Sequence, residues 1–134
     1  MHNGSCLCGR VKYEIRGAIG ESYFCHCSRC RKASGSAFAS SALVATADFV
    51  ILEGNDFLKS FSVKGVHRVF CAECGSPIIS RRDAMPQAVR VRLGSLDSPH
   101  TRGPQGHIFV GSKAEWFEIH DDLPQYQELP TERR

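Results

Sequence analysis

Seven cysteines in three tight clusters constrain the fold of this chain more than any other feature of its sequence. The clusters occupy residues 6–8, 25–30 and 71–74. In a reducing compartment, cysteines grouped this closely bind metal more often than they form disulfides. Because seven is odd, the natural partition is four plus three: four thiolates close a tetrahedral zinc site, and three leave one coordination position free. The sequence therefore predicts two zinc ions per chain, one structural and one at an open three-cysteine site.

No segment of the sequence resembles an export signal or a membrane span. Residues 1–6 contain no basic stretch followed by an apolar run, and the longest purely apolar stretch, 49–52, is far too short to cross a bilayer. We therefore expect a cytoplasmic protein with no membrane partner. The formal charge of +3 assumes neutral thiols, and metal ligation deprotonates thiols. The basic excess, and with it most of the argument for a nucleic-acid partner, therefore disappears in the metal-loaded protein.

Strand patterns dominate the chain and predict an all-β fold. Residues 11–16 and 89–93 alternate apolar and polar side chains, which is typical of antiparallel sheets with one face in solvent. Helical turns are expected only at 28–34 and 46–49. We predict a single zinc-binding domain over residues 1–134, in which 124–134 form a surface tail that frays at its last two arginines, Arg133 and Arg134. Further β-like runs cover residues 22–25, 37–45, 57–63, 68–70, 78–81 and 107–110.

The closed site is predicted from the third cluster. Cys71 and Cys74 followed by Gly75 form a zinc-knuckle signal, in which glycine relieves the crowded backbone after the second ligand. A knuckle supplies two ligands and needs two more, and Cys6 and Cys8 can supply them. The alternative interpretation is that these cysteines are small buried apolar groups, but four at ligand spacings favour metal.

The open site is predicted from the second cluster, in which Cys25, Cys27 and Cys30 can face one ion. His26 stands between two of these ligands, so we expect its ring to point away from the metal, behind the ligands or towards solvent. Three thiolates around Zn²⁺ carry a net charge of −1 and make a weak Lewis acid. Such a centre is poorly suited to hydrolysis and better suited to holding a fourth thiolate, whose proton the metal displaces.

Residues close to the open site can meet the charges of a small anionic thiol. The cationic side chains of Arg29, Arg31 and Lys32 can receive carboxylates, and the turn Ser34-Gly35-Ser36 can present backbone N–H groups to an anion. A solvated basic turn is the alternative interpretation of the same residues.

Other interpretations of the cysteines and of the charge remain open at this level. Cys71 and Cys74 could join the second cluster, which would leave the first pair without partners. An iron–sulfur protein is a weaker alternative, because this sequence has no eighth cysteine to complete two sets of four cysteine ligands. A zinc deaminase is disfavoured because no His-x-Glu occurs. A nucleic-acid or protein adaptor could use a basic strand face formed by Arg81, Arg82, Arg90 and Arg92.

The ordered motifs resemble the glutathione-dependent formaldehyde-activating enzyme family, which also includes centromere protein V. The resemblance spans residues 3–126 and is carried by five segments. It implies a fold similar to that of the Mss-type accessory proteins of small GTPases, in which a zinc ion holds twisted antiparallel sheets together. The five segments are Gly4-Ser5-Cys6-Leu7-Cys8-Gly9, residues 25–31, Phe70-Cys71-Ala72-Glu73-Cys74-Gly75, residues 93–97 and His107-Ile108-Phe109.

The resemblance implies roles for the cysteines and an activity. Cys6, Cys8, Cys71 and Cys74 would be the structural zinc ligands, and Cys25, Cys27 and Cys30 the ligands of the catalytic site. The implied activity is that of a carbon–sulfur lyase that forms or cleaves S-hydroxymethylglutathione, with glutathione, or a related small thiol, and formaldehyde, or another small electrophile, as partners. A zinc protein that binds glutathione or another small thiol without catalysis is the competing hypothesis, because thiols add to formaldehyde readily without help.

Overall fold

The computed structural model describes residues 1–130 and divides into two compact units. Unit 1 consists of Met1–Gly20 and Ala42–Thr101, and unit 2 consists of Glu21–Ser41 and the chain from Arg102 onward. The prediction of one domain over residues 1–134 stays a prediction. The predicted fraying at Arg133 and Arg134 lies outside the described residues. Within residues 1–130, no helix is long and apolar enough to cross a membrane.

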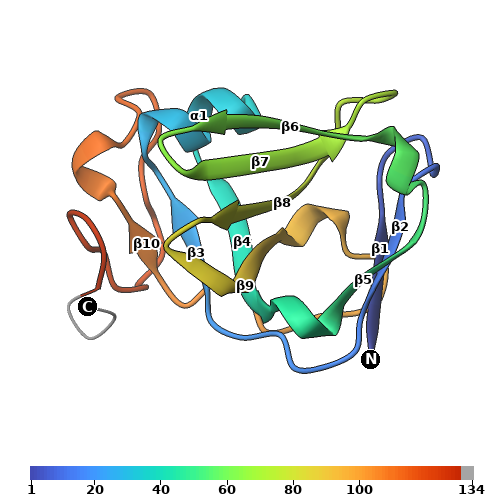
Figure 1. Ribbon diagram of the computed structural model, residues 1–134. Coiled ribbons are helices and arrows are strands. Elements are labelled where there is room, and N and C mark those ends of the chain that lie inside the picture. The colour runs from blue at the N-terminus through green and yellow to red at the C-terminus, as the bar shows by residue number, and fades with distance from the viewer. Residues whose placement is uncertain (131–134) are drawn as a thin grey trace. The chain divides into compact units, whose positions relative to one another are not determined.

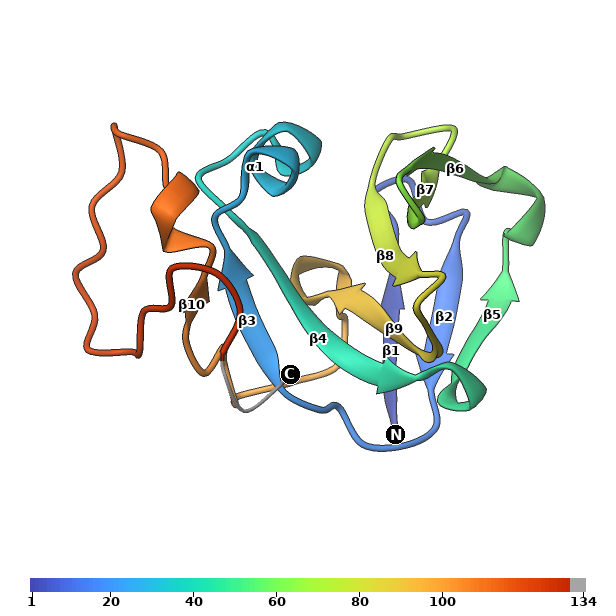
Figure 2. The same cartoon turned by 60° about the vertical axis from the view of Figure 1, so that its left-hand side comes forward.

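The first sheet of unit 1 carries the amino-terminal cysteines at the end of one of its strands. Its order is β1 (His2–Ser5), β2 (Lys12–Ile15) and β5 (Phe49–Glu53), and both pairings are antiparallel (Figure 2). The alternation predicted around β2 is confirmed, because the side chains of Val11, Tyr13 and Ile15 are fully buried while Lys12 and Arg16 are exposed. The buried hydroxyl of Tyr13 is satisfied by Ser95 Oγ at 2.6 Å.

The second sheet of unit 1 carries the other cysteine pair. Strands β6 (Leu58–Val63), β7 (Val66–Cys71), β8 (Pro77–Arg82) and β9 (Met85–Arg92) are consecutive antiparallel neighbours (Figure 1). The turn between β7 and β8 contains Cys74. Strand β4 (Ala39–Ala45) begins in unit 2 and ends in unit 1. The core of unit 1 includes the side chains of Val11, Tyr13, Ile15, Val44, Cys71, Ile78 and Val91.

Unit 2 holds the remaining cysteines between a strand and a short helix. Strand β3 (Ser22–Cys25) pairs in parallel with β10 (His107–Ile108), and α1 (Ser28–Ser34) begins three residues after β3 ends. This parallel pair departs from the antiparallel pattern of the other sheet pairings described above. Residues 124–128 lie beside β10 and the residues that follow it and are joined to them by hydrogen bonds, such as that from His107 N–H to the carbonyl of Pro124 at 2.8 Å. This part of the predicted tail is therefore tied to β10.

The predicted all-β fold class is confirmed, and every predicted β run overlaps an observed strand. The helical turns expected at 28–34 and 46–49 appear as α1 and as a 3₁₀ turn at Thr46–Asp48. Strands β1 and β5 were not predicted. β1 contains polar residues and a glycine, and β5 has a continuous apolar run without alternation, so neither shows a period of two. The other 3₁₀ turns are Asn55–Phe57, Leu93–Ser95 and Val110–Ser112.

Candidate metal centres

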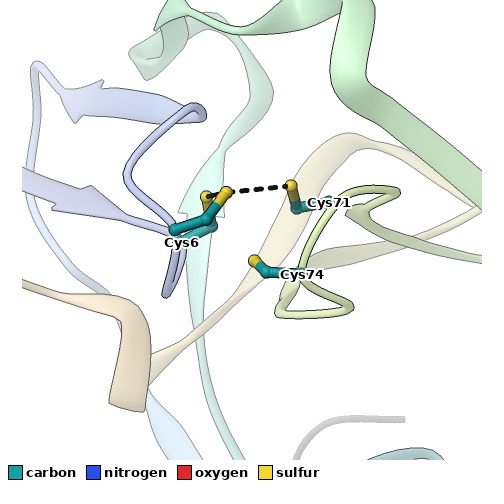
Figure 3. A group of neighbouring side chains, drawn as sticks. Cys6, Cys71 and Cys74 are labelled. Carbon is teal, nitrogen blue, oxygen red and sulfur yellow. Dashed lines mark hydrogen bonds between the residues drawn. The ribbon is translucent and has the colours of Figure 1, made fainter.

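Four sulfur atoms converge in unit 1 from two similar turns. Cys6, Cys8, Cys71 and Cys74 each place Sγ within 4.8 Å of the others, and Figure 3 shows the labelled side chains turned towards one another. Sγ of Cys8 lies 3.5 Å from that of Cys6 and 3.8 Å from that of Cys71. The predicted grouping of these four residues is therefore present in the structure, and the alternative that joins Cys71 and Cys74 to the second cluster is not.

Both turns use a glycine in the left-handed region immediately after the second cysteine. Gly9 has φ of +81° and Gly75 has φ of +79°, a backbone conformation that other residues adopt at a cost. The N–H of Gly75 donates to the carbonyl of Cys71 at 2.7 Å, and that of Gly9 donates to the carbonyl of Cys6 at 3.1 Å. These bonds fold each turn so that its two thiols point the same way.

Ser76 joins the two turns, and sequence reasoning did not identify it. Its Oγ accepts a hydrogen bond from the N–H of Leu7 at 2.9 Å and lies 3.2 Å from Sγ of Cys74. The hydroxyl of Ser76 lowers the pKa of Cys74 to about 5, whereas burial raises the pKa of Cys71 to about 11. The backbone N–H of Arg10 lowers the pKa of Cys8. Thus two of these thiols are already shifted towards the thiolate form that a metal requires.

Three further sulfur atoms converge in unit 2, at the junction of β3 and α1. The Sγ atoms of Cys25, Cys27 and Cys30 lie within 4.8 Å of one another, and all three residues are partly buried. Cys27 is also the N-cap of α1, because its Sγ accepts a hydrogen bond from the N–H of Cys30 at 3.3 Å. The start of the helix therefore brings the third thiol back over the first two.

The donor chemistry of this group fits a divalent cation. Hydrogen bonds from the thiols of Cys25 and Cys30 lower the pKa of Cys27 to about 2, and the same sharing raises the pKa of Cys25. The three sulfur atoms thus share protons, and a cation that favours thiolate ligands, such as Zn²⁺, can replace them. Both cysteine groups could therefore hold metal ions, the first with four thiolates and the second with three.

The ring of His26 is not part of the three-thiol group. Neither of its nitrogens belongs to the described set of ligand atoms within 4.8 Å, as the sequence predicted, but the ring is fully buried rather than solvent-facing. Its Nε2 lies 2.8 Å from Nδ1 of His107, whose Nε2 lies 3.0 Å from a carboxylate oxygen of Asp121. Burial, followed by the charges of His107 and Lys113, lowers the pKa of His26 to about 4.

The basic residues predicted to bind carboxylates lie on α1 and differ in burial. Arg29 and Lys32 are exposed, whereas Arg31 is partly buried and its Nε has no hydrogen-bond partner among the described residues. An unpartnered buried donor of this kind is rare in proteins and suits an external acceptor.

The turn after α1 has its own hydrogen bonds. Gly35 caps the helix with φ of +67°, and its N–H donates to the carbonyl of Arg31 at 2.8 Å. The N–H of Ser36 donates to Oγ of Ser34 at 3.3 Å, and this hydroxyl lies 3.1 Å from the carbonyl of Phe38. Anion binding by residues 34–36 stays a prediction, and it would require these N–H groups to exchange their present partners.

Fold and donor groups together define a mostly β protein with one four-cysteine and one three-cysteine group. A family model described as glutathione-dependent formaldehyde-activating enzyme matches residues 1–112, so the chain belongs to this family. The match includes all seven cysteines and ends before Asp121.

Known proteins similar to the chain agree with this assignment. Relatives from Aspergillus flavus and Aspergillus oryzae, described provisionally as glutathione-dependent formaldehyde-activating enzymes, are each 28% identical over 79 residues. The match covers 57% of this chain but only 41% of each relative's length. A crystal structure of a Rhodobacter sphaeroides protein aligns with a TM-score of 0.63 at 24% identity, covering 75% of this chain and 92% of that one. That likeness shows a shared fold.

Proposed function

We propose that the chain forms S-hydroxymethylglutathione from glutathione and formaldehyde, or cleaves it in reverse, as a zinc-dependent carbon–sulfur lyase. The observation that carries the proposal is the three-thiol group of Cys25, Cys27 and Cys30, in a chain that belongs to a family named for this activity. The names of the curated relatives point to the same two substrates. We further propose that Cys6, Cys8, Cys71 and Cys74 hold a structural zinc ion.

The open site would use the chain's own residues to prepare a thiol for reaction. A zinc ion held by three thiolates would supply one open position and lower the pKa of a thiol bound there. Cys25 is held by strand pairing with Ile108, and the N–H of His26 donates to the carbonyl of Ile108 at 3.0 Å. Cys30 is fixed by the first turn of α1. The three donors are therefore held in place before any substrate arrives.

The proposed chemistry needs little beyond a positioned thiolate. The glutathione sulfur forms a bond to the carbon of formaldehyde, the π electrons of the carbonyl move to oxygen, and the oxygen takes up the proton that the thiol gave up. Holding both reactants at one site converts a bimolecular encounter into a local one, which we propose as the main source of acceleration. The reverse sequence cleaves the adduct.

Arg31 is proposed to hold a carboxylate of glutathione, with Arg29 and Lys32 adding positive charge. Arg31 is the best placed of the three, because its buried Nε has no partner among residues 1–130 and a guanidinium can bind a carboxylate through two parallel hydrogen bonds. Ser34, Gly35 and Ser36 follow at the end of the same helix and are proposed as secondary contacts. The substrate would thus be held at its sulfur and at a carboxylate.

Glutathione affinity tests both ends of this proposal. With the zinc-loaded protein, S-methylglutathione is expected to bind much more weakly than glutathione by calorimetry, because its sulfur can no longer ionise. Arg31→Ala is expected to weaken glutathione binding by about 1–3 kcal/mol, the usual cost of losing a hydrogen bond to a charged group.

The matched control is Lys59→Ala, which removes one positive charge from β6 in unit 1 and is expected to leave the affinity unchanged. Equal affinity for glutathione and its S-methyl analogue would rule out binding through the thiolate. A loss of affinity in Lys59→Ala as large as that in Arg31→Ala would show that overall charge, rather than Arg31, holds the carboxylate.

A further inference from the structure

Three polar side chains in unit 2 form a continuous hydrogen-bonded chain from the surface to the residue between two of the thiols. Asp121, at the surface, lies 3.0 Å from Nε2 of His107, and Nδ1 of His107 lies 2.8 Å from Nε2 of His26. Both imidazoles are buried, with exposed fractions of 0% for His26 and 2% for His107. Among the four ring nitrogens of these two histidines, Nδ1 of His26 alone has no partner: it is buried and makes no hydrogen bond with any described residue.

The carboxylate of Asp121 determines the direction of both hydrogen bonds, the one from His107 to Asp121 and the one between His26 and His107. An ionised carboxylate only accepts hydrogen bonds, so Nε2 of His107 must carry a hydrogen and donate it. In a neutral His107, Nδ1 is then an acceptor, and Nε2 of His26 must donate to it. A neutral His26 with its hydrogen on Nε2 has a bare lone pair on Nδ1.

The opposite direction is costly. If His107 carried hydrogens on both nitrogens, Nδ1 of His107 would donate to His26, and the hydrogen of His26 would move to Nδ1. That arrangement would bury an N–H without an acceptor, and orphaned buried donors are rare and destabilising. The surroundings provide no substitute acceptor among the ring contacts: Phe38 and Phe117 pack against His26 at centroid distances of 5.4 Å and 6.1 Å.

We propose that Nδ1 of His26 is a preset acceptor site for a small O–H donor, and that His107 and Asp121 are positioning residues that keep this nitrogen available. A buried acceptor without a protein partner commonly marks the place of a bound water or of a ligand group. Two sources supply the same chemistry here: an ordered water, or the hydroxyl of the thiol–formaldehyde adduct. The assignment of the adduct hydroxyl rests on the proposed function, whereas the direction of the hydrogen bonds among Asp121, His107 and His26 does not.

The backbone of His26 belongs to the open-cysteine loop, and its ring lies against His107, Phe38 and Phe117. Cys25 and Cys27 are its immediate neighbours, and its N–H is bonded to the carbonyl of Ile108 in β10, the strand that also carries His107. The same strand pair thus fixes the thiol loop and the ring behind it. An O–H group bound at Nδ1 would be oriented by a rigid partner whose hydrogen-bonding polarity is set from Asp121.

Nitrogen NMR of histidine-labelled full-length protein tests the direction of the chain. The sequence has six histidines, so the ring signals can be assigned with single His→Gln variants. At neutral pH we expect His26 and His107 to carry their hydrogens on Nε2, with Nδ1 of His26 unprotonated. A hydrogen on Nδ1 of His26 would overturn the proposal, whether or not the protein has activity.

Asp121→Ala tests the positioning role, because it removes the group that sets the polarity. We expect a second tautomer of His26, with hydrogen on Nδ1, to appear in this variant and not in the matched control Asp122→Ala, which alters the next carboxylate along the chain. If Asp121→Ala does not fold, Asp121→Leu provides the same test, because leucine is close to aspartate in size and has no atom that can accept a hydrogen bond. An unchanged single tautomer in a folded Asp121 variant would contradict the positioning role.

The Nδ1 resonance of His26 also identifies the O–H donor. An unprotonated ring nitrogen that accepts a hydrogen bond resonates at a lower frequency than one with a free lone pair. A lowered frequency in the ligand-free protein indicates water, and a lowering only after glutathione and formaldehyde are added to zinc-loaded protein indicates the adduct. A free lone pair under both conditions would refute the acceptor site, while the tautomer result would stand separately from any failure of turnover.

Discussion

Cys71→Ser is expected to unfold unit 1 or to leave the protein insoluble. A structural zinc ion contributes about 10–16 kcal/mol to folding, which is comparable to the whole stability of an ordinary domain, about 5–15 kcal/mol. Removing one of four thiolates weakens that contribution, and the buried serine hydroxyl replaces a sulfur that has no exposed surface. Soluble yield, circular dichroism and the melting temperature measure the effect.

Cys8→Ser separates the loss of metal from the loss of core packing. Cys71 belongs to the buried core, but Cys8 is exposed, so replacing Cys8 changes the ligand set without disturbing the apolar interior. Both variants are expected to lose the fold if zinc holds the two turns together. A folded Cys8→Ser with an unchanged melting temperature would show that Cys71 acts through packing alone, and a folded, unaltered Cys71→Ser would remove the structural assignment altogether.

Cys27→Ser is expected to abolish activity and to lose one metal ion while keeping the fold. Cys27 belongs to the three-cysteine group and also caps α1 through its sulfur. Serine is among the preferred N-cap residues, so the helix keeps its cap while the open site loses a ligand. Elemental analysis should show one fewer zinc per chain, with the β-sheet circular dichroism largely retained.

The matched control for this variant is Ser28→Ala, at the exposed first residue of α1, which is expected to keep both metals and full activity. If Cys27→Ser collapses as Cys71→Ser does, both cysteine groups are structural, and the proposal of catalysis at the open group loses its basis.

The sequence predicted the grouping of the cysteines because the spacing of candidate ligands is local information. Two cysteines within four residues, followed by Gly75, define a turn whose conformation needs no tertiary context. The same holds for α1, where Cys27 and Gly35 mark both ends of the helix. That Cys6 and Cys8 join Cys71 and Cys74 was inferred by counting ligands, and the structure shows this grouping.

Long-range polar contacts were not predictable in the same way. Ser76 follows the knuckle in sequence, but its bond to Leu7 spans 69 positions and has no local pattern. His107 belongs to one of the segments that carry the family resemblance, but the sequence assigned no function to its side chain. Its contact with Asp121 depends on how the polypeptide turns back after β10. The orphaned nitrogens of His26 and Arg31 are properties of burial, which single-sequence patterns do not report.

The most direct test of the proposed function is the rate of S-hydroxymethylglutathione formation with and without zinc-loaded protein. Because glutathione and formaldehyde combine spontaneously, the measured quantity is the excess rate that remains after the uncatalysed rate has been subtracted. Exchange NMR measures both rates, in samples with and without protein that contain the same reactant concentrations. We expect an excess rate that is proportional to protein concentration, saturates with glutathione and is absent in Cys27→Ser. Saturable glutathione binding with no excess rate would contradict the proposed lyase activity and leave a thiol-binding zinc protein.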